Sequence, residues 1–280
     1  MSRWFELKLD FPEAILLKKA VRVFTQVAYS DRELPTSMFN NVIPNNADLH
    51  LSPTMVLLVS TNSHFRFPEM TTVLAMKPPC SSVSRLWCSK SCRTLCVSLH
   101  RLKCLLERNT EDSVTLYGDE GAVDRIFYEI GDDDGIKYSS TLPVISLRDQ
   151  IQMDPGFVGY EYPMRLGLSS EIFRAFITQS DSHGFKVHAR VSQTQVVLRV
   201  VNNEMVFRPE PGVCEIESDG GRYPFVLKYD LQHKRAFLNA AMLSEMVWIL
   251  NSVELITVLS FPIVGLGNLM FTQLNPVVPN

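Results

Sequence analysis

The sequence PFVLKYDLQHKRAFLNAA, residues 224–241, guides the interpretation of the whole chain. Residues 224–229 alternate between apolar and polar side chains, a pattern that predicts a strand. The helical spacing that follows predicts a short basic helix over 230–241, with Asp230 capping its N-terminus. Further strands are predicted at 246–250, 255–261 and 269–272, before an apolar tail at 274–278. This stretch has no nucleophile beside a base, no metal-ligand spacing and no phosphate loop.

The composition is that of a folded protein with no strong overall charge. The chain has 280 residues, of which 46% are hydrophobic, and its formal net charge is −3. That length suits one large or two ordinary domains, and the apolar content suffices for a sizeable core. Since the overall charge indicates no nucleic-acid partner, only a local basic surface would point to one.

Residues 247–271 are apolar, but they favour buried strands over a membrane span. Asn251, Glu254 and Pro262 interrupt the stretch, whereas a membrane helix needs about 20 consecutive apolar residues. Residues 1–9 carry charges and no apolar run, so we expect no signal peptide there.

The chain has six cysteines, and we expect them to be reduced intracellular thiols. Cys88, Cys92 and Cys96 are four residues apart, which differs from the C-x-x-C spacing of a structural zinc site. No metal and no cofactor is therefore expected.

The N-terminal part predicts a strand at 5–9 and then a helix over 13–28, with Pro12 before it. A loop is expected at 29–47, and no structure is assigned to 77–96. Further strands are predicted at 49–51, 55–60, 64–67, 72–76, 113–117, 125–130 and 136–145, with a helix ending near Arg108. Residues 146–160 are polar and predict a connecting loop.

After that loop the opening pattern recurs, which indicates an internal duplication. A shift of 157 residues places 5–9 over 162–166 and Ile15 over Ile172. Residues 99–106 similarly match 231–238. The sequence therefore predicts an α+β fold with two similar domains, 1–145 and 161–280, joined by the loop 146–160. Each domain would carry two short helices on antiparallel sheets.

The predicted helices share a basic surface. One basic helix usually presents only a solvated face, but recurrence in four helices favours binding of a polyanion without reading its sequence. The candidate DNA-binding residues are Lys18, Lys19, Arg22, Arg101, Lys103, Arg108, Arg174, Lys234 and Arg235.

An ordered series of short motifs resembles the DNA sliding clamps, and most of all the proliferating-cell-nuclear-antigen branch of that family. The motifs are WFELK at 4–8 with ILLKK at 15–19, residues 49–59 with NSHF at 62–65, VSL at 97–99 with EDSVTL at 111–116, EY at 161–162 with SSEIF at 169–173, and LNP at 274–276. The series extends over nearly the whole chain in order.

The resemblance implies a homotrimeric ring around duplex DNA, with helices lining the hole and no catalytic chemistry of its own. Such a protein would be nuclear, or lie at the viral replication site. It would act in DNA replication and repair by tethering a DNA polymerase, a clamp loader and other proteins with short apolar peptides. Strand edges at 136–145 and 211–218 would close the ring. The implied partner-binding residues are His64, Phe65, Ile151, Met153, Leu274 and Pro276.

Three alternatives remain open at this point. The first is a subunit of a heterotrimeric checkpoint clamp in the DNA-damage response, which shares the fold. An adaptor that no longer encircles DNA is the second. An enzyme is the third, although His64, His100, His183, His188 and His233 lie in no recognisable constellation with Ser, Cys or a carboxylate.

Overall fold

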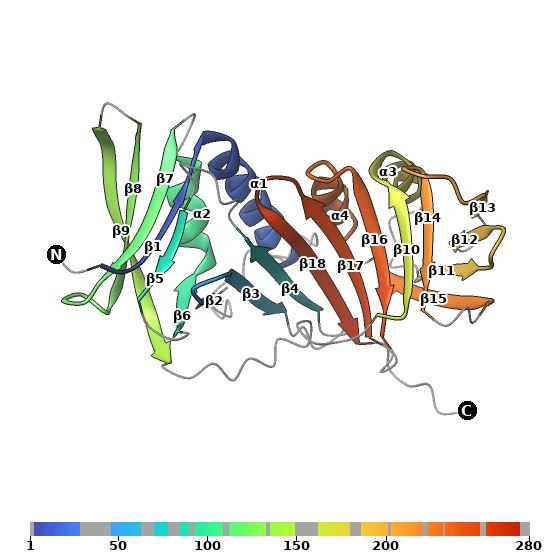
Figure 1. Cartoon of the computed structure of the whole chain (residues 1–280), viewed down its shortest axis with the longest axis horizontal. Helices are drawn as coiled ribbons and strands as arrows, with labels where there is room; N and C mark the ends of the chain where they lie inside the picture. The colour runs from blue at the N-terminus through green and yellow to red at the C-terminus, as the bar shows by residue number, and fades with distance from the viewer. Residues whose placement is uncertain are drawn as a thin grey trace, which may run out of the picture. The chain divides into compact units, whose positions relative to one another are not determined.

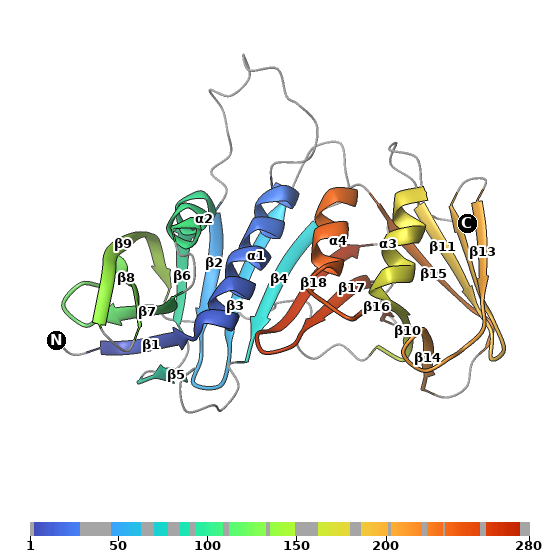
Figure 2. The ribbon, with the colours of Figure 1, turned by 90° about the horizontal axis from the view of Figure 1, so that it is seen from above.

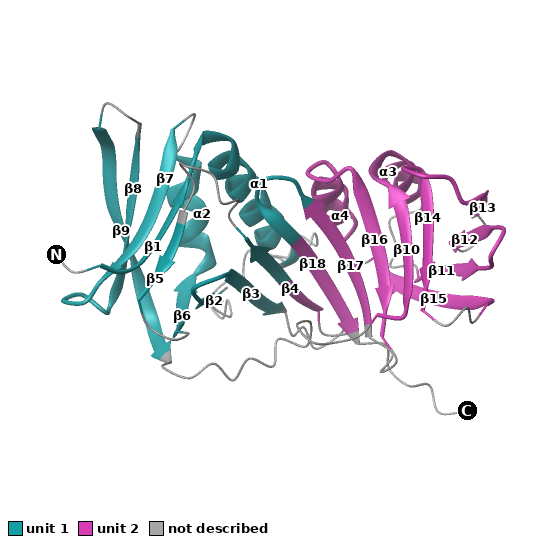
Figure 3. Ribbon diagram, viewed as in Figure 1, with its two compact units in different colours: residues 1–61, 73–153, 263–268 teal, residues 62–72, 154–262, 269–280 magenta. Residues whose placement is uncertain are grey.

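The computed structural model of the chain divides into two compact units (Figure 3). Unit 1 comprises Met1–Thr61, Val73–Met153 and Ile263–Asn268, and unit 2 comprises Asn62–Thr72, Asp154–Pro262 and Leu269–Asn280. The structure describes residues 3–28, 46–62, 70–77, 85–89, 93–108, 112–132, 135–148, 162–179, 186–200, 203–219, 223–231, 233–252 and 256–274.

The first half of the chain runs through one strand, one helix, five strands, a second helix and three strands (Figure 1). These elements are β1 (Arg3–Leu9), α1 (Phe11–Ala28), β2 (Asn46–Leu51), β3 (Val56–Asn62), β4 (Met70–Met76), β5 (Arg85–Cys88), β6 (Arg93–Ser98), α2 (Leu99–Glu107), β7 (Ser113–Asp119), β8 (Arg125–Asp132) and β9 (Gly135–Arg148).

The second half repeats the same order of elements. They are β10 (Met164–Ser169), α3 (Ser170–Gln179), β11 (Lys186–Val191), β12 (Val196–Val200), β13 (Asn203–Phe207), β14 (Cys214–Ser218), β15 (Phe225–Asp230), α4 (Lys234–Ala241), β16 (Met246–Asn251), β17 (Ile256–Ile263) and β18 (Gly267–Leu274). The fold is therefore α+β, with four helices and mostly antiparallel strands in the described residues.

The strands of unit 1 form a continuous series in the order β4-β3-β2-β6-β9-β8-β7-β1-β5. Strand β9 pairs with two neighbouring strands: Gly135–Pro143 pairs with β8, and Val144–Arg148 pairs with β6. The pairing of β1 with β7 places Leu7 opposite Leu116, and both side chains are buried. Burial of such apolar pairs sets the register, since a slip of one residue would turn them to solvent.

Unit 2 repeats these pairings in two separate sheets, in the orders β14-β10-β16-β17-β18 and β13-β12-β11-β15. Where β6 and β9 pair through their backbones in unit 1, β15 and β18 are joined by a side chain. The buried amide of Gln273 accepts a hydrogen bond from the Asp230 backbone N–H at 2.8 Å and donates one to the Asp230 carbonyl at 3.0 Å. That amide satisfies both backbone groups at the end of β15.

The helices pack in pairs within each unit, α1 against α2 and α3 against α4 (Figure 2). Helix α2 buries Leu99, Leu102, Leu105 and Leu106 against β2, β6 and β9. Helix α3 similarly buries Phe173, Phe176 and Ile177 and contacts β10 and β16. The apolar stripes predicted from the sequence therefore do face the sheets, which leaves the basic side of each helix outward.

The structure corrects two details of the predicted C-terminal helix. Helix α4 begins at Lys234 rather than near Leu231, and its N-cap residue His233 makes no capping hydrogen bond through its side chain. Asp230 does not cap a helix, because it is the last residue of β15 and its backbone is held by Gln273.

The starts of the helices give only an approximate measure of the repeat. Helices α1 and α3 begin at Phe11 and Ser170, 159 residues apart, where the predicted match used a shift of 157. Helices α2 and α4 begin at Leu99 and Lys234, 135 residues apart, where the predicted match used a shift of 132. An apolar helical pattern repeats every three or four residues, so it fixes the register only to within a turn.

Most other predicted elements are present, with boundaries that differ by a few residues. The segment to which no structure was assigned contains β5 and the start of β6, and β5 pairs with β1 through Phe5 and Cys88. Strand β9 continues to Arg148, beyond the predicted end at Ile145. The predictions for 29–45, 63–69, 78–84, 149–161 and 275–278 lie outside the described residues.

Candidate nucleic-acid interface

Five of the predicted basic residues lie on α1 and α2 of unit 1, which pack side by side. Helix α1 contributes Lys18, Lys19 and Arg22, and α2 contributes Arg101 and Lys103. Lys19, Arg22 and Arg101 are exposed, and the other two are half-buried. The apolar residues of both helices are turned to the sheet, so the cations gather on the outward surface. We call these five residues the unit 1 basic surface.

Glu107, the last residue of α2, holds three of these cations near the junction of the two helices. Its carboxylate lies 3.4 Å from Arg22 Nε and 3.7 Å from Lys103 Nζ. Its backbone carbonyl accepts a hydrogen bond from Lys18 Nζ at 3.5 Å. One carboxylate among three cations leaves an excess of positive charge, which suits an anionic ligand.

Arg108 is directed elsewhere. Its NH1 group donates to the Tyr138 hydroxyl on β9 at 2.8 Å, and its guanidinium carbon lies 5.1 Å from the centroid of that ring. A cation stacked on an aromatic ring gains about 0.5–1 kcal/mol at an exposed site. Arg108 is therefore held against the sheet, apart from the contacts around Glu107.

In unit 2 the predicted cations are fewer. Arg235 is exposed on α4, and Arg174 is exposed on α3, where its Nε donates to the Ser170 carbonyl at 3.3 Å. Lys234 Nζ donates at 3.3 Å to the carbonyl of Thr178, in the last turn of α3. We call these three residues the unit 2 basic helix surface.

The contacts of Lys234 and Lys18 have the same physical basis. Each ammonium lies at the C-terminal end of the neighbouring helix, where carbonyls lack intrahelical partners and the helix dipole is negative. Both lysines thus have a structural contact besides any contact with a ligand. The correspondence is one of arrangement: in each unit a lysine of one helix contacts the last turn of its neighbour.

The predicted partner-binding residues fall almost entirely outside the described residues. His64, Phe65, Ile151, Met153 and Pro276 all do so. Leu274 ends β18, and the structure describes its backbone but not its side chain. The peptide site therefore stays a prediction from the sequence.

The residues that the structure describes also bear on other kinds of site. No group of three or more His, Cys, Asp or Glu residues among them is placed to hold a metal ion. Over the same ranges, no helix combines the length and the apolar character that crossing a membrane requires. His100 Nε2 lies 3.6 Å from Cys104 Sγ on exposed α2, and buried His233 packs edge-on against the Phe237 ring.

Two features of the structure were not predicted from the sequence. Glu107 is the acidic partner of the unit 1 basic surface, and its spacing of four from Lys103 on a predicted helix was a usable signal. The second is the alternation of Lys186, His188 and Arg190 along β11, which marks a basic sheet face outside the helices.

Comparison of the sequence with protein-family models and with curated proteins found no match.

Proposed function

We propose that this chain is a DNA sliding clamp, which encircles duplex DNA and tethers a polymerase and other replication and repair proteins to it. The observation that carries the proposal is the twofold recurrence of one strand, one helix, five strands, one helix and three strands, with cations on the outward side of the helices. Such a surface suits phosphate contacts that are independent of base sequence.

The mechanism requires no reacting group. Lysine and arginine contacts with phosphates, many of them through water, hold the duplex loosely enough to slide. A polymerase bound to the ring then stays at a high effective concentration near its template. The clamp therefore speeds DNA synthesis by keeping the polymerase on its template. Its own lysine and arginine residues only hold the duplex in place.

Among the described residues, strand edges that carry no sheet partner support assembly into a ring. Strands β13 and β14 each end their sheet order in unit 2, and Gly135–Pro143 of β9 pairs with β8 on one side. Ile136, on that part of β9, is 64% exposed. Pairing of such edges between subunits would bury exposed backbone groups and apolar side chains together.

Reversal of charge on the helices tests the DNA contact. The exposed pair Lys19→Glu and Arg235→Glu should abolish polymerase stimulation and weaken the binding of duplex DNA. Loss of two phosphate contacts should reduce the salt slope of binding by about 1.8 for each chain that contacts the duplex. The control is Arg125→Glu with Arg165→Glu, which reverses two exposed cations on strands. Stimulation that survives the helix variant would show that the helices do not carry the DNA.

The mass in solution separates the proposal from its main alternative, a subunit of a heterotrimeric checkpoint clamp. One chain has a mass of 31.8 kDa, so a homotrimer would have a mass of about 95 kDa. Light scattering across a concentration range should give the larger value. A persistent monomer would instead favour assembly with two different subunits.

A further inference from the structure

The four-stranded sheet of unit 2 carries a second basic surface, on its exposed face. Along β11, Lys186, His188 and Arg190 are exposed, whereas Val187 and Ala189 between them are buried. Alternation is the ordinary result of a strand with one face on the core, but here every outward residue of the strand is basic or imidazole.

The neighbouring strands extend this charge across the sheet. Arg199 on β12 and Lys228 on β15 both lie directly opposite His188, and both are exposed. Neighbouring strands are about 4.8 Å apart, and alternate residues along a strand about 6.8 Å. The five residues Lys186, His188, Arg190, Arg199 and Lys228 therefore form a compact patch, which we call the sheet basic surface.

Few acids balance this patch. Glu204 on the outer strand β13 pairs with Arg199 at 2.5 Å, and Asp230 lies opposite Lys186. Burial, then the charges of Lys228 and Lys186, lower the pKa of His188. The direction of that shift agrees with a positive potential on this face.

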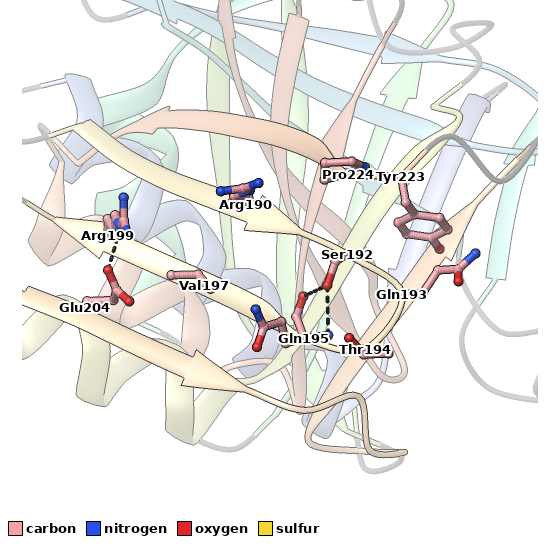
Figure 4. A pocket seen from close by; sticks show the side chains of 10 residues that line it. All are labelled: Arg190, Ser192, Gln193, Thr194, Gln195, Val197, Arg199, Glu204, Tyr223 and Pro224. Atoms are coloured by element: carbon pink, nitrogen blue, oxygen red, sulfur yellow. Dashed lines mark hydrogen bonds and ion pairs between the residues drawn. The ribbon is translucent and has the colours of Figure 1, made fainter.

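A cavity of about 660 Å³ adjoins the patch (Figure 4). Arg190 and Arg199 reach it from the strands, and Gln193 and Gln195 reach it from the turn between them. Tyr223 and Glu204 also line the cavity, and the Tyr223 ring lies 5.6 Å from the ring of Phe225.

The turn is well fixed. Ser192 Oγ donates to the Gln195 carbonyl at 3.0 Å and accepts from the Gln195 backbone N–H at 3.1 Å. A third bond joins the Ser192 N–H to the Gln195 carbonyl at 2.9 Å. The side-chain amides thus stand on a rigid support beside the two arginines.

We propose that the sheet basic surface binds single-stranded nucleic acid, with phosphates along Lys186, His188 and Arg190 and a base in the cavity beside Tyr223. The spacing of alternate residues on β11 is comparable with that of successive phosphates in an extended strand. An aromatic ring and amide groups next to a cationic track are the features that hold single strands without sequence preference. An acidic peptide would use the cations but has no need of the ring and the amides.

This surface differs from the helix surfaces assigned to duplex DNA, so the two proposals can fail separately. The probe is a labelled oligothymidylate of about 12 nucleotides, within the usual site size of one binding module, and needs no ring loading. Fluorescence anisotropy at several salt concentrations compares Arg190→Gln with Lys186→Gln against a matched pair on the helices, Lys19→Gln with Arg235→Gln.

The sheet variant should reduce the salt slope by about 1.4 and the affinity at 0.1 M salt by about 25-fold, since each phosphate contact on a single strand contributes about 0.7 to the slope. The helix variant should bind the oligonucleotide as the parent does. Loss of binding in the helix variant with retention in the sheet variant would overturn the assignment. The same holds if the parent binds polyglutamate but not the oligonucleotide, which would make the face an acidic-peptide site.

Tyr223 gives an independent readout of the base. Tyr223→Leu should weaken the oligothymidylate at least about fivefold, in the range of one lost stacking contact. It should leave unchanged the affinity for an abasic oligonucleotide of the same length, because the phosphates remain. Equal weakening of both probes would contradict a base contact in the cavity.

Discussion

Replacing Glu107 with glutamine should strengthen the binding of duplex DNA. The carboxylate lies within 4 Å of Arg22 and Lys103, at 3.4 and 3.7 Å, and is the acid that both cations contact. Glutamine keeps the shape of the side chain and its acceptor oxygen but removes the charge. The three side chains are about one-third to one-half exposed, so loss of the ion pairs should cost no more than about 1 kcal/mol of stability.

The expected gain in affinity follows from one unit of charge. A single carboxylate neutralises at most one of the cations near it, so the variant gains one net positive charge per chain. Each additional phosphate contact steepens the salt dependence of duplex binding by about 0.9. At 0.1 M salt, that slope corresponds to about an eightfold higher association constant.

The assay is fluorescence anisotropy with a linear duplex, over a range of salt concentrations. The control is Glu217→Gln, which removes the same charge from a strand, where Glu217 pairs with Arg165 at 3.2 Å. Glu107→Gln should give a steeper slope and tighter binding than both the parent and the control. Equal slopes in all three proteins, or an equal gain in the control, would refute the assignment of the unit 1 basic surface to DNA.

Three further measurements test the structure itself. Gln273→Leu leaves the backbone N–H and carbonyl of Asp230 without their partners and should lower the free energy of unfolding by about 1–3 kcal/mol, whereas an unchanged denaturation midpoint would contradict that bridge. Iodoacetamide should alkylate exposed Cys104 before buried Cys214, because burial raises the pKa of the Cys214 thiol to about 11; peptide mass spectrometry giving the reverse order would be inconsistent with this. Burial raises the pKa of Tyr229 well above 10.0, so its phenol supports stability below about pH 10 and that support is lost as the pH rises further; Tyr229→Phe should lose less stability there than the parent.

The repeated order of elements could be predicted from the sequence, because it depends on local patterns of residues. Alternation along 225–229 and helical spacing along 13–28 each fix an element by its own residues. The end of β15 at Asp230 could not be predicted, because its backbone is hydrogen-bonded to Gln273, 43 residues further along the chain, and is paired with Lys186 of β11. Strand β5 has only four residues and is defined by its pairing with β1, another long-range contact.

The sequence predicted the basic character of the candidate site but not the contacts between its residues. Composition identified the basic residues of the helices, because an apolar stripe on one side leaves the charges on the other. The sequence did not show that Glu107 would lie among three cations, since two of them come from α1, far away in the chain. Nor did it show the patch on the unit 2 sheet, because three strands must pair in register before their cations become neighbours.

The Gln273 bridge affects the order in which the parts of unit 2 unfold. Unit 1 is continuous in backbone hydrogen bonds from β4 to β5, so local opening must break a ladder at every step. In unit 2, β13, β12, β11 and β15 form a separate ladder, and the Gln273 amide of β18 is hydrogen-bonded to it at Asp230. We expect that small sheet to act as its own cooperative unfolding block, whose amide protons exchange together and earlier than those of β10 and β16.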